Sequence, residues 1–179
     1  MKILVVVDMQ NDFITGSLGT PEARAILPNV KKKIEAAVKD GDLIFYTRDT
    51  HMDDYLETRE GKNLPVEHCV YKTEGWRIHS DLFPPGSYEN YRVIDKFTFG
   101  SRELPEMILY SEVAKSCDEI ELVGLCTDIC VISNALLLKA AFYETMDISV
   151  DATCCAGVTP ESHEAALKTM EMCQINVKR

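Results

Sequence analysis

The amino-acid sequence predicts a single α/β domain, doubly wound and three-layered, with a six-stranded, mainly parallel sheet and helices on both faces. Short apolar runs alternate along the chain with longer segments of helical periodicity, which is typical of a parallel sheet with helical crossovers. The first run, Ile3–Val7, is apolar at every position, as expected of a strand buried on both faces. At 179 residues, the chain has the size of one domain, so residues 1–179 are assigned to it.

The first half of the chain contains two predicted strands and one long helix. The helix runs from Thr20 to about Lys39, because a threonine N-cap, a proline and a glutamate open it and a glycine follows its end. The second strand spans residues 42–48 and stops at Asp49. Residues 49–90 show no clean periodicity, and so long a segment in a compact domain is usually functional.

The second half continues the alternation of strands and helices. Each strand is short and rich in aliphatic residues, and each helix carries a recognisable start or an apolar stripe. The predicted strands are 91–95, 120–123 and 146–150, the helices are 102–116, 131–141 and about 159–173, and an edge strand is expected at 175–177.

Residues with reactive or charged side chains follow the predicted strands at the points where they end. Parallel sheets bind ligands at the carboxyl ends of their strands, so these residues are expected to share one edge of the sheet. They are Asp8, Asp49, Lys96, Cys126 with Cys130, and Asp151.

Cys130 occupies the turn between the fourth strand and the helix that follows it. Gly124 permits unusual backbone angles there, and Thr127 and Asp128 are good helix N-caps. Cys130 is therefore expected in the first helical turn, where the helix dipole favours a thiolate. The alternative is a buried structural cysteine, and a nucleophile needs a base elsewhere in the chain.

Two charged residues at strand ends are candidates to assist Cys130. Asp8 is flanked by apolar residues, so burial is expected to raise its pKa toward that of a useful base. Lys96 is placed to orient the pair and to hold the cysteine anionic. Taken singly, the aspartate equally suits a loop cap and the lysine a solvated surface charge.

The long segment after the second strand offers a set of metal-ligating side chains. Asp49 and His51 form a D-x-H pair, His68 follows in the same loop, and Glu60 lies between them. Oxygen and imidazole ligands of this kind leave coordination positions open for water or substrate. The pattern alone is short and also occurs without metal. The other histidines, at positions 79 and 163, are assigned structural roles.

Charge and cysteine usage exclude several classes of function. The net charge of −10 argues against nucleic acid and anionic membranes as partners. The seven cysteines lack disulfide-framework spacing and no export signal is recognised, so reduced thiols and a cytoplasmic location are expected. Dithiol chemistry is a minor alternative, since Cys126 and Cys130 are spaced C-x-x-x-C and the adjacent pair Cys154-Cys155 suits a disulfide poorly.

Four motifs in register resemble the isochorismatase-like cysteine hydrolases over essentially the whole chain. They are Asp8–Phe13, the Asp49/His51 pair, Lys96, and Gly124–Val131. Pro65, His68 and Cys69, together with the metal-type residues, most resemble nicotinamidases within that family.

The resemblance implies a role for each member of a catalytic triad. Cys130 would be the nucleophile, Asp8 the acid/base and Lys96 the third member. It also implies a cis peptide bond between Leu125 and Cys126, and an oxyanion hole made by the backbone N–H groups of Cys126 and Cys130.

The resemblance further implies a bound metal and a substrate class. Asp49, His51 and His68, with Glu60 as a further candidate ligand, would hold Zn²⁺ or another divalent ion such as Mn²⁺ or Fe²⁺, which in nicotinamidases binds the pyridine nitrogen. The substrate would be a small-molecule amide, and the protein a homo-oligomer, either a dimer or a tetramer.

Three departures from the family pattern leave the substrate open. Cys126 stands where the family usually carries alanine, residues 55–63 are atypical, and Leu64 replaces an aromatic residue. Phe13, Leu64 and Phe99 are then the expected substrate contacts. Nicotinamide is the first candidate substrate, another small amide or carbamoyl compound the second, and a non-catalytic thiol or metal-binding redox module is the alternative outside enzymes.

Overall fold

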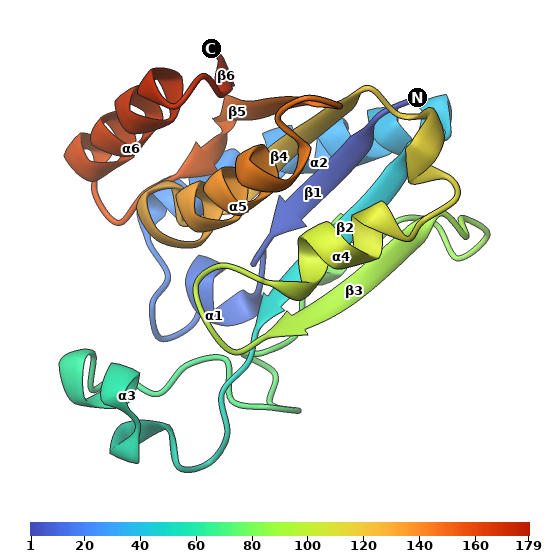
Figure 1. Cartoon of the computed structure of the whole chain (residues 1–179). Coiled ribbons are helices and arrows are strands. Elements are labelled where there is room, and N and C mark those ends of the chain that lie inside the picture. The colour runs from blue at the N-terminus through green and yellow to red at the C-terminus, as the bar shows by residue number, and fades with distance from the viewer.

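The computed structural model describes residues 1–179 and contains one six-stranded sheet in the order β3-β2-β1-β4-β5-β6 (Figure 1). All five pairs of neighbouring strands are parallel, which confirms the α/β fold and extends the expected mainly parallel sheet to a fully parallel one. The strands are β1 (Ile3–Val7), β2 (Leu43–Asp49), β3 (Tyr91–Lys96), β4 (Glu119–Leu125), β5 (Asp147–Ala156) and β6 (Asn176–Lys178).

Helices connect consecutive strands and add short turns around the sheet. No helix is both long and apolar enough to cross a membrane. The helices are α1 (Asn11–Ile14), α2 (Pro21–Asp40), α3 (Arg59–Asn63), α4 (Glu103–Leu109), α5 (Ile132–Phe142) and α6 (Pro160–Met172), with a π-helical turn at Thr127–Val131. In Figure 1, α3 and its flanking loops extend away from the sheet.

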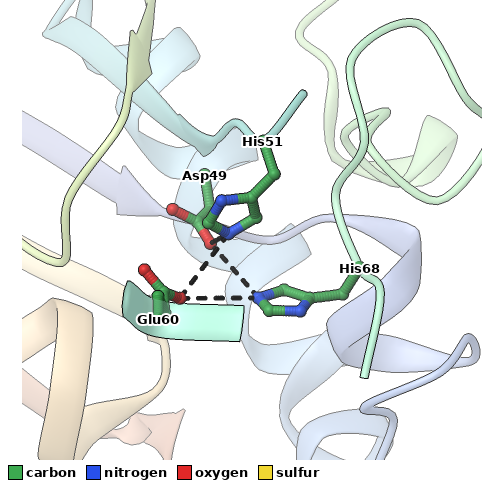
Figure 2. A group of neighbouring side chains, drawn as sticks. All are labelled: Asp49, His51, Glu60 and His68. Carbon is green, nitrogen blue, oxygen red and sulfur yellow. Dashed lines mark hydrogen bonds and ion pairs between the residues drawn. The ribbon is translucent and has the colours of Figure 1, made fainter. Parts of the chain in front are cut away.

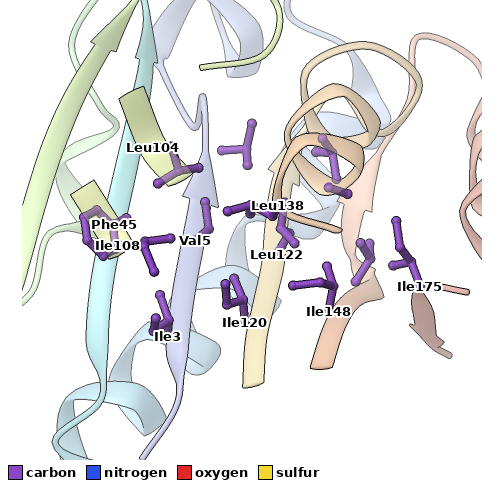
Figure 3. Packing of buried hydrophobic residues seen from close by; sticks show 14 of the residues in the cluster. Ile3, Val5, Phe45, Leu104, Ile108, Ile120, Leu122, Leu138, Ile148 and Ile175 are labelled. Atoms are coloured by element: carbon purple, nitrogen blue, oxygen red, sulfur yellow. The ribbon is translucent and has the colours of Figure 1, made fainter. Parts of the chain in front are cut away.

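Two hydrophobic layers hold the helices against the sheet, and alternate residues of β1 divide between them. Ile3, Val5 and Val7 face the layer that contains α4, α5 and α6, part of which Figure 3 shows. Leu4 and Val6 face the layer that contains α2 and the segment around Leu82. Because both faces of β1 are covered, its uninterrupted apolar sequence is explained by the fold.

The predicted helix at 102–116 is shorter in the structure. The α-helix ends at Leu109, and a separate 3₁₀ turn occupies Ala114–Ser116. Ser111 Oγ accepts a hydrogen bond from the backbone N–H of Ala114, so a local side-chain contact replaces continued helix. Tyr110, at the end of the helix, is 81% exposed.

The fifth strand is longer than predicted, and this corrects the position of Asp151. β5 continues to Ala156 through an irregularity in its register with β4, so Asp151 lies within the strand and not at its carboxyl end. Its carboxylate forms an ion pair with Lys33 of α2 at 2.6 Å. Asp151 is therefore part of the structural charge network and not of the edge that carries the candidate site.

A fully buried glutamate, Glu121 of β4, organises that charge network. Its carboxylate lies 2.9 Å from Lys2 Nζ, 3.2 Å from Lys33 Nζ and 3.0 Å from Lys178 Nζ. Burial opposes ionisation of Glu121, but these three ammonium groups more than offset it and hold its pKa below the ordinary value.

We expect Glu121→Gln to lower the free energy of unfolding at pH 7 by about 1–3 kcal/mol, because three partly buried lysines lose their shared counter-ion. A depressed pKa stabilises the fold above the pKa of the unfolded state, and this contribution is lost as the pH falls through the folded pKa. Urea unfolding at pH 7 and at successively lower pH should therefore show the difference shrinking. Glu112→Gln, which removes an exposed ion pair, is the control and should change little.

Candidate active site

Four neighbouring strands bring the expected reactive residues to one edge of the sheet. Asp49, the last residue of β2, pairs directly with Lys96, the last residue of β3. Asp8 follows β1 with a φ of +47°, in the left-handed region, which turns the chain sharply at the strand end. A Cβ at Gly124, which has a φ of +121°, would lie 2.1 Å from the carbonyl oxygen of Val7, so β1 and β4 meet only with glycine here.

The Lys96 ammonium lies at the centre of the site. It is 2.7 Å from Asp8 Oδ2, 3.1 Å from Asp49 Oδ1 and 3.4 Å from Cys130 Sγ. The side chains of Lys96 and Asp8 are 1% and 0% exposed. A buried cation is costly unless it is paired, and Lys96 is paired with three groups that carry or can acquire negative charge.

Burial and charge move the pKa values of these groups together. Burial raises the pKa of Asp8, against the opposing effect of Lys96, and the neighbouring Asp49 raises it further. Burial disfavours the charged form of Lys96, but Asp8, Cys130 and Asp49 together raise its pKa well above the ordinary value. The site therefore combines an aspartate of increased basicity with a permanently charged lysine.

Burial acts on Cys130 in the opposite sense to the helix dipole, which the sequence predicts to favour a thiolate. Complete burial and the charge of Asp8 raise the thiol pKa well above its ordinary value, and Lys96 only partly opposes them. Both effects favour the thiol form of Cys130 over the thiolate. A thiol needs a base nearby to act as a nucleophile, and the candidate is the Asp8 carboxylate, which contacts the same Lys96 ammonium as Cys130.

Thr47 fixes the orientation of Asp8. Its hydroxyl donates to Asp8 Oδ1 at 2.7 Å, and the Asp8 backbone N–H donates to the carbonyl oxygen of Thr47. The other carboxylate oxygen is left facing Lys96. One oxygen of Asp8 thus holds the carboxylate in place while the other faces the reactive groups.

The turn that carries Cys130 has the backbone geometry implied by the family resemblance. The peptide bond between Leu125 and Cys126 is cis. The carbonyl oxygen of Cys126 accepts hydrogen bonds from the N–H groups of Ile129 and Val131, both at 3.0 Å. This carbonyl points into the turn, and Cys126 and Cys130 both line the same cavity.

The four metal-type side chains converge on one point, as Figure 2 shows. Their ligand atoms all lie within 4.8 Å of one another. Asp49 Oδ2 is 3.0 Å from His51 Nε2 and 3.6 Å from His68 Nε2, and Glu60 Oε1 is 3.6 Å from His51 Nε2. Two carboxylates and two imidazoles of this arrangement fit a divalent transition metal. His79 and His163 lie outside this group and contact Asp81 and Thr127.

Residues outside the cluster hold its ligands in place. Gln10 is fully buried and exchanges hydrogen bonds with both backbone groups of Asp49, at 2.8 and 2.7 Å. His68 Nδ1 contacts the carbonyl oxygen of Val66 at 2.8 Å, which directs Nε2 toward the cluster. Tyr55 packs its ring against His51 and His68, with centroids 4.5 and 5.0 Å away.

A second anchor, Asp12, fixes the loop that carries His68. Asp12 Oδ2 accepts a hydrogen bond from the backbone N–H of Cys69 at 2.8 Å. The backbone of the same loop pairs with His51, whose N–H donates to the carbonyl oxygen of Cys69. The spacing between His51 and His68 therefore depends on Asp12 and on the backbone of Cys69.

A cavity of about 250 Å³ opens beside Cys130 and extends to the metal-type residues. The three expected substrate contacts all line it, although the sequence separates them widely. No lysine or arginine is among the lining residues, and its charged groups are both carboxylates. The lining residues are Phe13, Leu18, Thr20, Asp49, Glu60, Leu64, His68, Phe99, Cys126, Ile129, Cys130 and Val158.

Sequence reasoning missed part of the wall and most of the supporting residues. Leu18 and Val158 come from loops whose positions no local pattern predicts, and Thr20 was predicted as a helix N-cap but not as part of the cavity. Gln10 and Asp12 lie within the motif Asp8–Phe13, which the sequence analysis did identify. Their polar side chains, directly after a buried strand, could have indicated that they support the site.

Comparison with known proteins places the whole chain in one family. The sequence profile of the Isochorismatase domain matches residues 2–178. The chain therefore belongs to the isochorismatase family. A nicotinamidase of Saccharomyces cerevisiae is 26% identical over 216 residues, covering 99% of this chain and 99% of the relative.

Solved structures agree with this assignment and with the fold. A pyrazinamidase of Pyrococcus horikoshii in complex with zinc superposes with a TM-score of 0.82 at 28% identity, covering 99% of this chain and 98% of the other. An N-carbamoylsarcosine amidase of Thermoplasma acidophilum superposes with a TM-score of 0.78 at 29% identity, covering 100% and 96%.

We expect Asp12→Ala to weaken binding of Zn²⁺ by about 10- to 100-fold, because residues that orient a metal ligand typically contribute that much. Competition with a chromophoric chelator measures the affinity directly. Asp53→Ala removes an exposed acidic group from the loop between His51 and His68 and is the control for lost charge. Equal affinities in the two variants would show that the Asp12 contact with Cys69 does not support His68.

Proposed function

We propose that this protein hydrolyses a small neutral amide, nicotinamide in the first place, to the carboxylic acid and ammonia through a thioester on Cys130. Family membership and the nicotinamidase relatives support an amidohydrolase acting on C–N bonds. The observation that carries the proposal is the contact of Cys130, Asp8 and Lys96 beside a cavity of substrate size.

The first half of the reaction forms the thioester and releases ammonia. Asp8 takes the proton of the Cys130 thiol, and the sulfur attacks the amide carbonyl carbon. The backbone N–H groups of Cys126 and Cys130 donate to the oxygen on which negative charge develops. Asp8 then gives its proton to the departing nitrogen, so the C–N bond breaks and ammonia leaves.

The second half of the reaction uses the same carboxylate. Asp8 removes a proton from a water molecule, which attacks the thioester carbonyl, and the C–S bond breaks to return the Cys130 thiol and the acid. A single carboxylate serves both halves because burial raises its pKa. Lys96 remains charged throughout and limits the rise in the pKa of Asp8, so the carboxyl group can still lose its proton.

A divalent metal fits the group formed by Asp49, His51, Glu60 and His68, because their ligand atoms converge. The contact of His68 Nδ1 with a backbone carbonyl also supports this, since it directs Nε2 toward the group. When bound, such an ion supplies a Lewis acid that anchors a ring nitrogen of the substrate. Asp49 links this group to Lys96, since its two oxygens face the two halves of the site. The ion is proposed to be Zn²⁺, by analogy with the zinc-bound relative.

The cavity favours a neutral substrate over the carbamoyl alternative. N-carbamoylsarcosine, on which a structural relative is named to act, carries a carboxylate. The lining contains no lysine or arginine to pair with a substrate anion. Nicotinamide is uncharged and flat, which suits apolar walls such as Phe13, Leu64 and Phe99.

The structure gives little support to a redox module. Burial, with the charge of Asp128, raises the pKa of Cys126 to about 12, and burial with the charge of Asp8 also raises the pKa of Cys130. Thiol exchange requires a thiolate, so both cysteines are poorly suited to it. The homo-oligomer and the cytoplasmic location expected from the sequence remain predictions.

Cys130→Ala is expected to abolish ammonia release from nicotinamide, while Cys126→Ala should keep turnover within about tenfold of wild type, because a backbone N–H and not the thiol acts at position 126. The two variants remove thiols from the same cavity and are matched controls for each other. Metal-loaded proteins are compared in a coupled ammonia assay. Activity in Cys130→Ala would reject the nucleophile, and inactivity of wild type on nicotinamide would reject the substrate.

Metal removal is expected to slow the hydrolysis of a substrate that has a ring nitrogen more than that of a substrate that lacks one. Benzamide has the shape of nicotinamide but no ring nitrogen for a metal to hold. We predict that the wild-type protein prefers nicotinamide by at least about tenfold in kcat/KM, the worth of one good polar contact. Chelation should reduce this preference, and added Zn²⁺ should restore it. A preference that survives complete metal removal would contradict the proposed anchor.

A further inference from the structure

Asn134 is a buried polar side chain in the first turn of a mainly apolar helix. It lies on α5 within the sequence Ile132–Phe142, and it is 0% exposed. Neither helix propensity nor packing requires asparagine at this position. A buried amide is costly unless its hydrogen bonds are satisfied, so the partners of Asn134 indicate what it does.

Three hydrogen bonds connect this amide to two separate segments. Its Nδ2 group donates to the carbonyl oxygen of Cys130 at 2.8 Å and to that of Phe99 at 3.3 Å. Its Oδ1 accepts from the backbone N–H of Ser101 at 2.9 Å. Two carbonyls and one N–H around the amide leave only one orientation that satisfies all three.

The segment at the far end of these bonds is the loop that follows Lys96 and carries the Phe99 wall of the cavity. Phe97 and Phe99 are 62% and 46% exposed, so burial of these rings does not hold the loop in place. Gly100 lies so close to α5 that a Cβ there would be 2.7 Å from Leu137 Cδ1. The close packing of Gly100 and the hydrogen bonds of the Asn134 amide therefore both hold the loop against α5, the helix that follows Cys130.

We propose that Asn134 is a positioning residue that holds the Phe99–Ser101 loop in register with Cys130. One amide thereby sets the separation between the apolar wall that contacts the substrate ring and the thiol that attacks the amide carbon. The inference rests on the proposed function for its kinetic consequences, whereas the hydrogen bonds themselves are independent of the substrate.

Two substitutions separate the two arms of this contact. Asn134→Ser keeps a hydroxyl that donates to the Cys130 carbonyl four residues earlier, but it is too short to reach the loop. Asn134→Asp keeps an acceptor for the Ser101 N–H but offers no N–H to the carbonyl oxygens. Ser149→Ala is the control, because it removes a buried hydrogen bond to Glu119 far from the cavity.

Kinetic constants for nicotinamide and the rate of Cys130 alkylation by iodoacetamide form the test. We expect Asn134→Ser to raise KM, with kcat and alkylation close to wild type, and Asn134→Asp to lower kcat and to change the alkylation rate. Each should lower kcat/KM by about 10- to 100-fold, the effect of a displacement of about 1 Å at a reacting site. In a Phe99→Ala background, the effect of Asn134→Ser on KM should disappear.

Two other outcomes, a loss of stability without a kinetic effect and a failure of the proposed function, can be told apart from this result. If both Asn134 variants lose stability as Ser149→Ala does but keep wild-type kcat, KM and alkylation, the positioning role is wrong. If Asn134→Asp does not fold, Asn134→Ser alone decides through its KM and the Phe99→Ala background. If wild type does not turn over nicotinamide, the proposed function fails, but the alkylation rate still tests the inference. A changed rate of Cys130 alkylation in Asn134→Asp would support the positioning role, and an unchanged rate would overturn it.

Discussion

The buried ammonium of Lys96 is the constraint on which the rest of the site depends. It touches a carboxylate from β1, a carboxylate from β2 and the thiol that follows β4, so it connects the ends of four neighbouring strands. A charge of this kind is retained in the interior only where partners offset the cost of removing it from water. The parallel register supplies those partners, because it sets Asp49 beside Lys96 and ends β1 against Gly124.

Asp49 extends this constraint to the metal-type residues. One of its oxygens faces Lys96 and the other faces His51 and His68, so a single carboxylate belongs to both halves of the site. Burial opposes its ionisation, but the two imidazoles and Lys96 hold its pKa below the ordinary value. A bound cation and Lys96 would therefore share one anion, and a substitution at either group is expected to alter the electrostatics of the other.

The sequence predicted the fold and the edge of the sheet that carries the site because both follow from local patterns. Apolar runs locate the strands, and the residue after each run is placed at the edge by the parallel topology alone. Asp151 was misplaced because its strand continues through an irregularity that alternation does not reveal. The helix dipole favours a thiolate at Cys130, but burial and the charge of Asp8 raise the pKa of this thiol, and the depth of burial is a tertiary property that the sequence does not reveal. The cavity wall at Val158 and the contact of Asn134 with the Phe99 loop depend on long-range packing, for which the sequence carries no short-range signal.

The central claim is that chemistry proceeds through a covalent bond to Cys130, and trapping that bond tests it most directly. Metal-loaded protein is mixed with nicotinamide, quenched with acid during turnover, digested and analysed by mass spectrometry. A nicotinoyl thioester on the peptide that contains Cys130, chased to free acid when quenching is delayed, is the predicted result. Turnover with Cys130 unmodified at every quench time, or with the acyl group on Cys126, would contradict the account.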